Sequence, residues 1–335
     1  MKRHRLDLER IADLKNLAWA AHRAGLGKRH RFEVQAFFHA LDRNLSILRT
    51  GLLEGQRPLG KFFRFEIWDP KPRIIHAPCF EDRVIHHALM RYCEPILDRA
   101  LIPTTFACRK GFGTLKAAKK ALENSSRFPW FAKVDMARYF DSIDHHHLLV
   151  LLLRKFKGPG VAELFDRILG SYAVSPGKGL PIGALSSQIF ANYYLDGLDR
   201  YLLETEKVGA VVRYMDDVVW WGPNRDAVAG CLERVRVWLR EHRGLELKEN
   251  VQVNRTHAGM VFLGFKIKPQ GLFLSRRRKQ RYVWALSRWE TRFREGHLNA
   301  KRLQAAYASV HAITSHAAST AWRRKVLATR GSLEV

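Results

Sequence analysis

The stretch RYMDDVVW, residues 213–220, decides how this sequence is interpreted, because two adjacent aspartates interrupt a run of apolar and aromatic side chains. The flanking residues are typical of β-strands, so the pattern predicts strand, turn and strand over residues 210–222. Charged side chains are rarely buried without a partner, and two neighbouring carboxylates repel each other. Asp216 and Asp217 therefore either form a turn exposed to water or hold a divalent cation.

The charge balance indicates the kind of partner. The 335 residues include 58 Lys and Arg against 32 Asp and Glu, a net charge of +26, and 47% of them are hydrophobic. This composition predicts a globular chain of two or three packed subdomains with a polyanionic partner, either nucleic acid or an anionic membrane. No apolar run is long enough to span a membrane, and the N-terminal MKRHRLDLER lacks the apolar core of a signal peptide. Nucleic acid is therefore the favoured partner, without a membrane.

The cysteines argue against a zinc site and against a disulfide framework. They are scattered along the chain and form no Cys-x-x-Cys pair. We therefore expect a reducing, cytoplasmic location. The four are Cys79, Cys93, Cys108 and Cys231.

Hydrophobic periodicity separates helical from strand-rich segments. Residues 7–54 have helical spacing, and residues 61–78 predict two strands around a Pro-containing turn. Further strands are expected at WFAKVDM (130–136), LELK (245–248) and VFLGFKI (261–267), and further helices near 144–156, over 188–204 and over 225–243.

The last sixty residues are predicted to be helical and are strongly basic. Residues 276–330 include 14 Lys and Arg and only two acids. A solvated helix face explains this bias poorly, so we expect the segment to contact nucleic-acid phosphates. Arg276, Arg277 and Arg278 stand at its start.

A third aspartate lies upstream, in FAKVDMARYFDSID. Apolar residues predict a strand that ends at Asp135. If this strand neighbours the strand–turn–strand unit, three carboxylates form a cluster that is costly alone and that bound Mg²⁺ relieves. Two such ions stabilise the attacking and leaving oxygens in phosphoryl transfer. The alternative is that Asp135 caps a helix while Asp216 and Asp217 form an exposed turn.

Three motifs together resemble the reverse transcriptases and follow one another in that family's order. They are KVDMARYFD (133–141), GLPIGALSSQIFANYYL (179–195) and YMDD (214–217). The resemblance extends over roughly residues 30–270 through five further stretches: KPRII, EDRVIHHAL, ACRKGFGT, GLELKEN and FLGF. It implies an α+β right-hand polymerase: a helical segment (1–60) joining the fingers, fingers and an antiparallel palm sheet (61–270), and a basic helical thumb (271–335). It also implies two Mg²⁺ ions, with Mn²⁺ as an alternative, bound by Asp135, Met136, Asp216 and Asp217.

Other roles are carried over where residues match the family. Phe140 matches the aromatic gate that crowds a ribose 2′-hydroxyl, with a core aromatic as the alternative. Lys248 resembles the lysine that protonates leaving pyrophosphate, although a surface lysine is the alternative. Lys71 and Arg73 resemble the cations that clamp the triphosphate. The implied nucleotide site also includes Ile182, Gly183 and Gln188. The resemblance further implies nucleic-acid contacts by Arg83, Arg109, Lys110, Gly111 and Gly264.

Two departures from the usual motif indicate one subfamily. Most reverse transcriptases carry Gln-Gly and Ser-Pro where this chain has Ile182-Gly183 and Ser187-Gln188. Together these replacements resemble the reverse transcriptases of diversity-generating retroelements, which are bacterial or phage-encoded. The resemblance implies copying of a template-repeat RNA and dNTPs into adenine-mutated cDNA. It also implies a small, basic, oligomeric accessory variability protein as a partner.

Two other interpretations stay open. One is another bacterial reverse transcriptase, either group II intron-like, against which Ile182 and Gln188 argue, or of a phage-defence type. The other is a basic scaffold that binds structured RNA without catalysis. The presence of all three aspartates and Phe140 argues against the scaffold.

Overall fold

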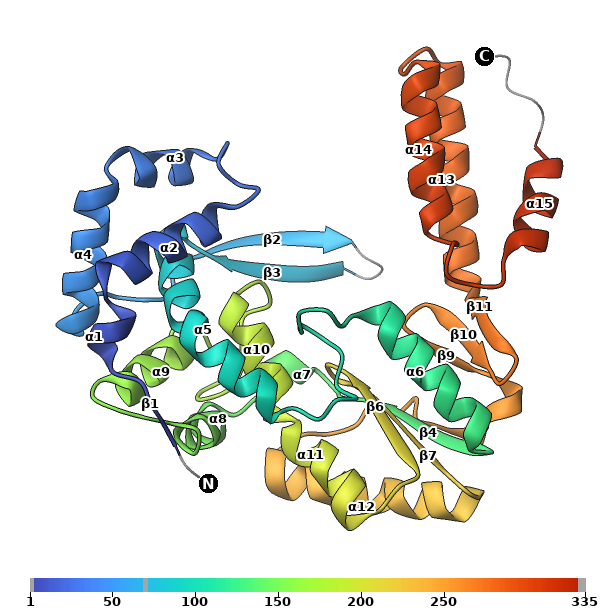
Figure 1. Cartoon of the computed structure of the whole chain (residues 1–335), viewed down its shortest axis with the longest axis horizontal. Helices are drawn as coiled ribbons and strands as arrows, with labels where there is room; N and C mark the ends of the chain where they lie inside the picture. Colours follow the sequence, from blue (N-terminus) through green and yellow to red (C-terminus); the bar gives the residue numbers. More distant parts are fainter. Residues whose placement is uncertain (1–2, 69–71, 331–335) are drawn as a thin grey trace. The chain divides into compact units, whose positions relative to one another are not determined.

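The computed structural model describes residues 3–68 and 72–330 (Figure 1). The chain forms two compact units, and each unit is assembled from three separate stretches of sequence. Unit 1 consists of Met1–Pro103, Asp135–Thr205 and Glu233–Glu249, and unit 2 consists of Thr104–Val134, Glu206–Leu232 and Asn250–Val335.

Unit 1 is mainly helical. Its strands form two small pairs: β1 (His4–Arg5) runs parallel to β5 (Phe156–Lys157), and β2 (Phe62–Trp68) runs antiparallel to β3 (Pro72–Pro78). A π-helical turn, Tyr201–Thr205, follows the helix α11. The helices are α1 (Leu8–Ile11), α2 (Leu14–Gly25), α3 (Phe32–His39), α4 (Leu41–Leu53), α5 (Phe80–Ala100), α7 (Tyr139–Ser142), α8 (His145–Leu153), α9 (Val161–Gly170), α10 (Leu185–Tyr194), α11 (Asp196–Arg200) and, from Glu233 onward, α12 (Arg225–Arg243).

Helix α5 is the central helix of unit 1, packed against α2 and α10. Its apolar residues recur at helical spacing, and Val84, Ile85, Ala88 and Leu89 are fully buried. The buried amide of Asn16, on α2, donates hydrogen bonds to the carbonyl oxygens of Ile11 and Ala88, at 2.8 and 3.2 Å. Buried polar groups need such partners, so this amide fixes how α2 lies on α5.

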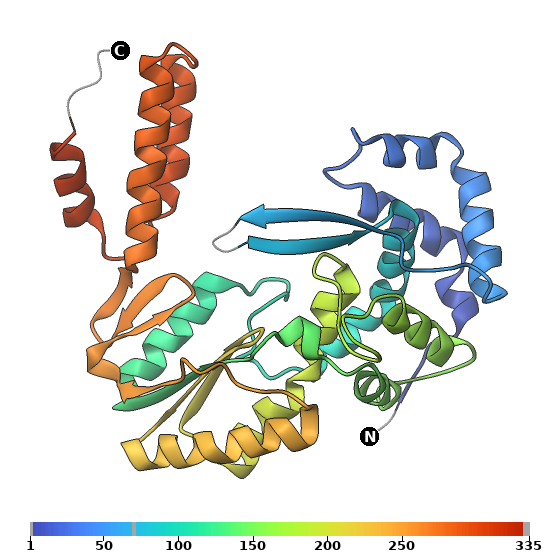
Figure 2. The ribbon, with the colours of Figure 1, turned by 180° about the vertical axis from the view of Figure 1, so that it is seen from behind.

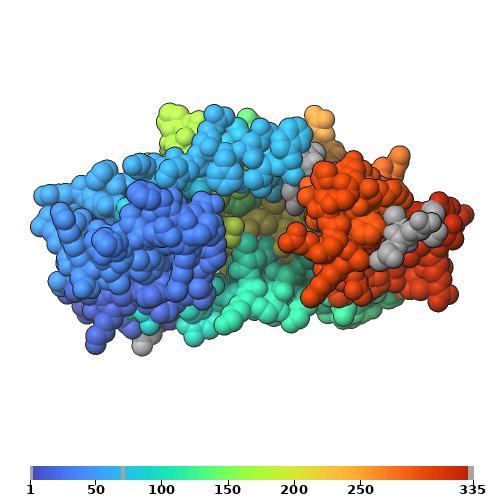
Figure 3. All heavy atoms as spheres, turned by 90° about the horizontal axis from the view of Figure 1, so that it is seen from above, coloured from blue at the N-terminus to red at the C-terminus, as the bar shows by residue number. Residues whose placement is uncertain are grey.

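The β2–β3 hairpin confirms the two strands predicted over residues 61–78. Its register runs from the pair Phe62 and Pro78 to the pair Trp68 and Pro72. All of β2 after its first residue is exposed, and the hairpin, in light blue, is visible in Figure 3. Lys71 lies outside the described residues.

Unit 2 is built on a four-stranded sheet in the order β6-β7-β4-β8, with a second sheet in the order β11-β10-β9. The pairs β6–β7, β4–β8, β9–β10 and β10–β11 are antiparallel. The strands are β4 (Trp130–Asp135), β6 (Ala210–Tyr214), β7 (Asp217–Gly222), β8 (Gln252–Arg255), β9 (Met260–Phe262), β10 (Phe265–Lys268) and β11 (Gly271–Leu274); the helices are α6 (Thr114–Arg127), α13 (Arg276–Arg294), α14 (Ala300–Ala312) and α15 (Thr320–Ala328), and a 3₁₀ turn spans Thr256–Ala258.

The core of unit 2 lies under α6, which covers one face of the four-stranded sheet (Figures 1 and 2). The buried face of α6 carries small residues, Ala117, Ala118 and Ala121, and these let the helix approach the sheet closely. Across from them lie large side chains of the strands, including Phe131 and Trp221. The Trp221 indole Nε1–H donates to the hydroxyl of Ser125 on α6, at 3.2 Å. Packing and one buried hydrogen bond therefore fix the sheet that carries the Asp216–Asp217 turn.

Most predicted elements agree with the structure, but three differ. One is the single strand expected at VFLGFKI (261–267), which the structure divides into β9 and β10. The strand–turn–strand over 210–222 and the helix over 225–243 are confirmed. The predicted strand at LELK is wrong: Leu247 forms only an isolated bridge with Met136, and the strand β8 begins later. The single helix expected over 188–204 is divided into α10, α11 and the π-helical turn. None of the helices in the described ranges is long and apolar enough to cross a membrane.

Candidate active site

Asp216 and Asp217 lie at the turn between β6 and β7. Tyr214 pairs with Asp217 across the hairpin, so Met215 and Asp216 form a two-residue turn. Met215 has a φ of +59°, a conformation that few residues other than glycine adopt and that costs energy. The buried strands on both sides hold the turn in this conformation. A strained backbone at a carboxylate pair points to a function for the turn.

Arg213 also holds this turn in place, through its buried side chain. Its side chain is fully buried, and its guanidinium Nη1–H donates to the carbonyl oxygen of Met215, at 3.1 Å. Its backbone exchanges hydrogen bonds with the Thr104 carbonyl and the Phe106 amide, at 3.0 and 2.9 Å. Arg213 is therefore a positioning residue that our sequence analysis missed, although a lone cation in the apolar strand AVVRY was the available signal.

Asp217 is paired with a lysine of the same sheet. The Lys133 ammonium, on β4, lies 3.3 Å from Oδ1 of Asp217, and both side chains are mostly buried. Lys133 stands two residues before Asp135 and points to the same face of β4, because side chains alternate along a strand. Lys133 was not among the residues predicted from the sequence to belong to the site.

Asp135 is paired with the predicted catalytic lysine, Lys248. The ammonium of Lys248 contacts Oδ1 of Asp135, and its backbone amide donates to the Asp135 carbonyl oxygen at 2.9 Å. Two residues on, the Ala137 amide donates to the carbonyl oxygen of Glu246, at 2.8 Å. The segment that carries Lys248 is thus fixed along the chain that leaves β4.

The donor chemistry of the three aspartates suits Mg²⁺, which prefers carboxylate oxygens. Asp135 and Asp217 each have a lysine ammonium beside them, so a positive charge compensates each carboxylate. Within the described ranges, no group of three or more His, Cys, Asp and Glu side chains is arranged to hold a metal ion. The three-aspartate metal site therefore stays a prediction.

The residues predicted to bind the nucleotide lie on connected parts of unit 1. The Leu180 amide donates to the carbonyl oxygen of Phe140, and the His76 amide donates to that of Ile182, each at 2.8 Å. Arg73 lies on β3, the strand that makes the second of these contacts. The half-buried Phe140 and Ile182 are thereby linked to the β2–β3 hairpin, whereas Gln188 is exposed on the first turn of α10.

Gly183 is required where the glycine-rich segment meets β3. Its φ is +128°, and a Cβ atom there would lie 2.8 Å from Cγ2 of Ile75. A side chain would collide with the hairpin and strain the backbone, so only glycine permits this approach. The next turn of chain is also anchored, because Oγ of Ser186 lies 2.6 Å from Nδ1 of His86 on α5. Burial lowers the pKa of His86 to about 4, so its imidazole is neutral at pH 7.

Of the residues predicted to contact nucleic acid, some are exposed, and others already contact other groups of the protein. Lys110 and Gly111 are exposed in the loop before α6. Arg109, beside them, donates to the Thr105 carbonyl oxygen at 2.9 Å, and its guanidinium lies over the Phe112 ring. Arg83 is mostly buried in unit 1, with Nη2 3.5 Å from a carboxylate oxygen of Glu33.

Arg278 fixes the turn that contains Gly264. Leu263 and Gly264 both have positive φ, +49° and +82°, and link β9 to β10. The Arg278 guanidinium lies 3.9 Å from the centre of the Phe265 ring, and its Nη2–H donates to the Leu263 carbonyl oxygen at 3.3 Å. Burial, followed by repulsion from neighbouring arginines, lowers the pKa of Arg278. Arg276 and Arg277 are more exposed than Arg278, so they are the better candidates for phosphate contact.

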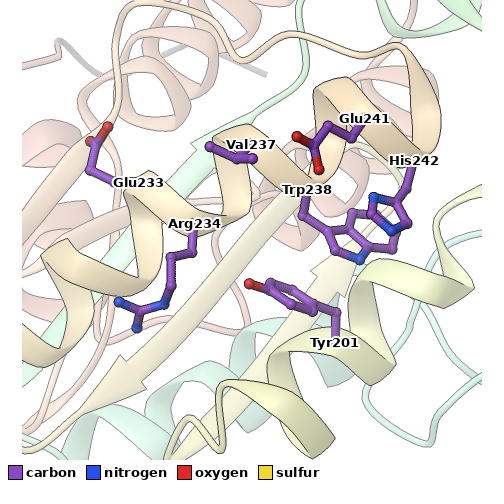
Figure 4. Close-up of a pocket in the computed structure, with 7 residues that line it drawn as sticks. All are labelled: Tyr201, Glu233, Arg234, Val237, Trp238, Glu241 and His242. Atoms are coloured by element: carbon purple, nitrogen blue, oxygen red, sulfur yellow. The ribbon is translucent and has the colours of Figure 1, made fainter.

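A pocket of about 540 Å³ lies elsewhere in unit 1, and none of the predicted site residues lines it (Figure 4). The rings of Tyr201 and Trp238 are stacked with centres 5.5 Å apart, and those of Trp238 and His242 with centres 5.1 Å apart. Tyr201 is the first residue of the π-helical turn. The remaining lining residues are Glu233, Arg234, Val237 and Glu241.

Comparisons with known proteins agree with the motif assignments. The chain is 28% identical over 144 residues to the group II intron-encoded protein LtrA of Lactococcus lactis, which is 40% of this chain and 23% of LtrA. It is 24% identical over 200 residues to protein YkfC of Escherichia coli, 55% of this chain and 51% of YkfC. The chain thus spans about half or less of the length of these curated relatives.

A solved structure supports the fold. Apo telomerase from Candida tropicalis matches with a TM-score of 0.52 at 12% identity, over 88% of this chain and 65% of that one. The family model described as reverse transcriptase (RNA-dependent DNA polymerase) matches residues 69–267, more than half of the 335 residues. The chain therefore belongs to the reverse transcriptase (RNA-dependent DNA polymerase) family.

Proposed function

We propose that this protein is an RNA-directed DNA polymerase that extends a cDNA primer on a template RNA with dNTPs. The observation that carries the proposal is the strained β6–β7 turn, which presents Asp216 and Asp217 from the sheet whose strand β4 ends at Asp135. In this proposal residues 1–60 form a helical segment that joins the fingers, residues 61–270 form the fingers and palm, and residues 271–335 form the thumb. The basic surfaces hold the nucleic acid through its phosphates.

The proposed chemistry assigns each residue one task. Bound Mg²⁺ would compensate the charge that develops on the attacking and leaving oxygens. Asp135, Asp216 and Asp217 would hold it. In the structure, the ammonium groups of Lys133 and Lys248 contact the carboxylates of Asp217 and Asp135, respectively. Lys248 would then be free to donate a proton to the leaving pyrophosphate. Phe140 would crowd the ribose 2′-position, and Arg73 and Lys71 would bind the triphosphate.

Primer extension tests the activity and separates it from the scaffold alternative. We expect dTMP incorporation on poly(rA) primed with oligo(dT) in the presence of Mg²⁺, and loss of incorporation with EDTA. RNA binding without incorporation, under all metal and partner conditions, would leave only the non-catalytic RNA-binding scaffold.

We further propose that the enzyme serves a diversity-generating retroelement and makes adenine-mutated cDNA with a small basic accessory protein. The departures Ile182-Gly183 and Ser187-Gln188 support this assignment. A group II intron-like enzyme is the second candidate, favoured by the likeness to LtrA, and a phage-defence enzyme is the third. A neighbouring pair of near-identical genomic repeats that differ at adenines would favour the first.

The error spectrum of Ile182→Gln tests the subfamily assignment. Ile182 lies half-buried beside β3, and its side chain makes no hydrogen bond because it has no polar atom. A glutamine could donate and accept one, and a net hydrogen bond contributes about 0.5–1.5 kcal/mol, up to about tenfold in relative rate. We expect Ile182→Gln to stay active and to misincorporate several-fold less opposite template adenines.

Sequencing cDNA made by both enzymes on one RNA template gives the measurement. Ile182→Leu is the matched control, because it keeps the apolar character and should keep the parent spectrum. Identical spectra for Ile182→Gln and the parent would remove the proposed role of this residue without contradicting polymerase activity.

A further inference from the structure

Phe32 is the most exposed large apolar side chain among those of the described residues. It is 84% exposed, at the first position of α3. Exposing a phenylalanine side chain to water is unfavourable by its transfer free energy. The N-terminal face that carries α3 is turned to the viewer in Figure 3 and is drawn in blue. An exposed ring of this kind is available to stack on a ligand.

Charged residues adjoin Phe32 in the chain. Arg31 precedes Phe32, and Glu33 follows it; Nη1 of Arg31 and Nη2 of Arg83 both approach Oε1 of Glu33, at 3.9 and 3.5 Å. Lys28 stands one turn before Arg31, whose amide donates to the Lys28 carbonyl oxygen at 3.0 Å. Two guanidinium groups thus share one carboxylate, and Lys28 is close enough to interact electrostatically with all three groups.

The positive charge of this group is incompletely compensated. Burial and repulsion from Arg83 and Arg31 lower the pKa of Lys28, and burial lowers that of Arg83. His87, on α5, has its pKa lowered to about 4 by burial and by Arg23, Lys28 and Arg83. The Arg83 side chain is only 11% exposed, and its Nε has no hydrogen-bond partner among the described residues. An anion bound here would relieve this repulsion.

We propose that Lys28, Arg31, Phe32 and Arg83 form a subsite for one unpaired nucleotide of an RNA strand. Its base stacks on the Phe32 ring, and its phosphate lies on the cations. Aromatic rings beside cations are the means by which proteins bind single-stranded nucleic acid, since every base has a stacking face. A paired base is already stacked, so the subsite prefers single strands to duplexes. The inference rests on RNA being the template, and it adds Lys28, Arg31 and Phe32 to the nucleic-acid contact predicted for Arg83.

Affinity measurements with matched variants test the subsite. Loss of one base stack weakens binding by about tenfold, so we expect Phe32→Ala to bind single-stranded oligo(rU) about tenfold more weakly. Phe32→Trp should bind like the parent. The control is Leu26→Ala, because Leu26 is an exposed apolar residue in the loop before α3 and cannot stack on a base. Affinity for an RNA duplex of the same length should be unchanged in all three variants.

The cations are tested separately through salt dependence. Lys28→Gln with Arg31→Gln should flatten the plot of log affinity against log salt by about 0.7 for each phosphate that the protein no longer neutralises. Arg49→Gln, at an exposed position on α4, is the control for the removal of a surface charge. RNA that carries 4-thiouridine should form a crosslink at the Phe32 peptide in the parent and in Leu26→Ala, but not in Phe32→Ala.

Two outcomes would overturn the subsite. One is equal oligo(rU) affinity for Phe32→Ala, Leu26→Ala and the parent. The other is that Phe32→Ala weakens binding to anionic phospholipid vesicles and leaves RNA binding unchanged. Primer extension run in parallel separates the two proposals, because active polymerase with unaltered RNA affinity in Phe32→Ala removes only the subsite.

Discussion

Asp216→Asn should lower dNTP incorporation by about a thousandfold or more. The substitution keeps the size of the side chain and its place in the Met215–Asp216 turn, but it removes the negative charge of a predicted metal ligand. Metal-based charge stabilisation contributes several kcal/mol to the transition state, and about 4 kcal/mol corresponds to about a thousandfold in rate. Affinity for primed RNA should stay within about twofold, because phosphate contacts by basic residues supply it.

Primer extension and RNA titration on the same preparations provide the measurements. Asp226→Asn is the matched control, since Asp226 is an exposed carboxylate ten residues downstream, on the first turn of α12. It should keep parent activity. Near-parent incorporation by Asp216→Asn would contradict the metal-ligand assignment, and equal loss in both variants would indicate a general charge effect.

Asp82→Ala should lower the free energy of unfolding by about 3 kcal/mol, the scale on which breaking a buried ion pair destabilises a protein. Asp82 is only 2% exposed. Its carboxylate accepts hydrogen bonds from the Gly60 amide at 3.0 Å and from Nη2 of Arg57 at 3.4 Å. Alanine would leave a mostly buried guanidinium and a backbone N–H without this acceptor. The loss would also loosen the chain that enters β2, because Gly60 lies two residues before it.

Urea unfolding followed by tryptophan fluorescence measures this loss. Asp42→Ala, on the exposed face of α4, is the control and should change stability little. Arg57→Met combined with Asp82→Ala should be less destabilised than the two single variants added together, because both partners of the pair are then removed. Strict additivity would show that the two side chains do not stabilise each other.

Sequence patterns predicted the elements whose signals are local. The β6–β7 hairpin follows from apolar residues on both sides of a polar turn, and α12 follows from its hydrophobic spacing. In the structure Gly244, with a φ of +61°, directly follows this helix. The prediction at LELK failed for a physical reason. Leu245 and Leu247 are both buried, as strand alternation suggests, but the segment pairs with residues 135–137 at only a few points and forms no ladder.

The supporting residues could not be predicted because their partners lie far away in the sequence. Asp82 lies in the EDR motif, yet its partners are Arg57 and the Gly60 amide, 25 and 22 residues away. Lys133 pairs with Asp217 only because two strands are neighbours in the sheet. Arg278 belongs to a basic run that we expected to contact phosphates, but its guanidinium packs on the Phe265 ring. Composition gives the charge of such residues and not the direction of their side chains.

The alternation of the two units along the chain has a consequence for biosynthesis. Unit 1 includes Glu233–Glu249, so the ribosome must have delivered almost three quarters of the 335 residues before all parts of this unit exist. Chains emerge at about 5–20 residues per second, and domains usually fold as they appear. Residues 1–103 therefore cannot complete unit 1 until Glu233–Glu249 has been synthesised. During this time the β2–β3 hairpin can already be formed and exposed. Neither unit can be cloned as one contiguous fragment, and expression should be sensitive to chaperone supply.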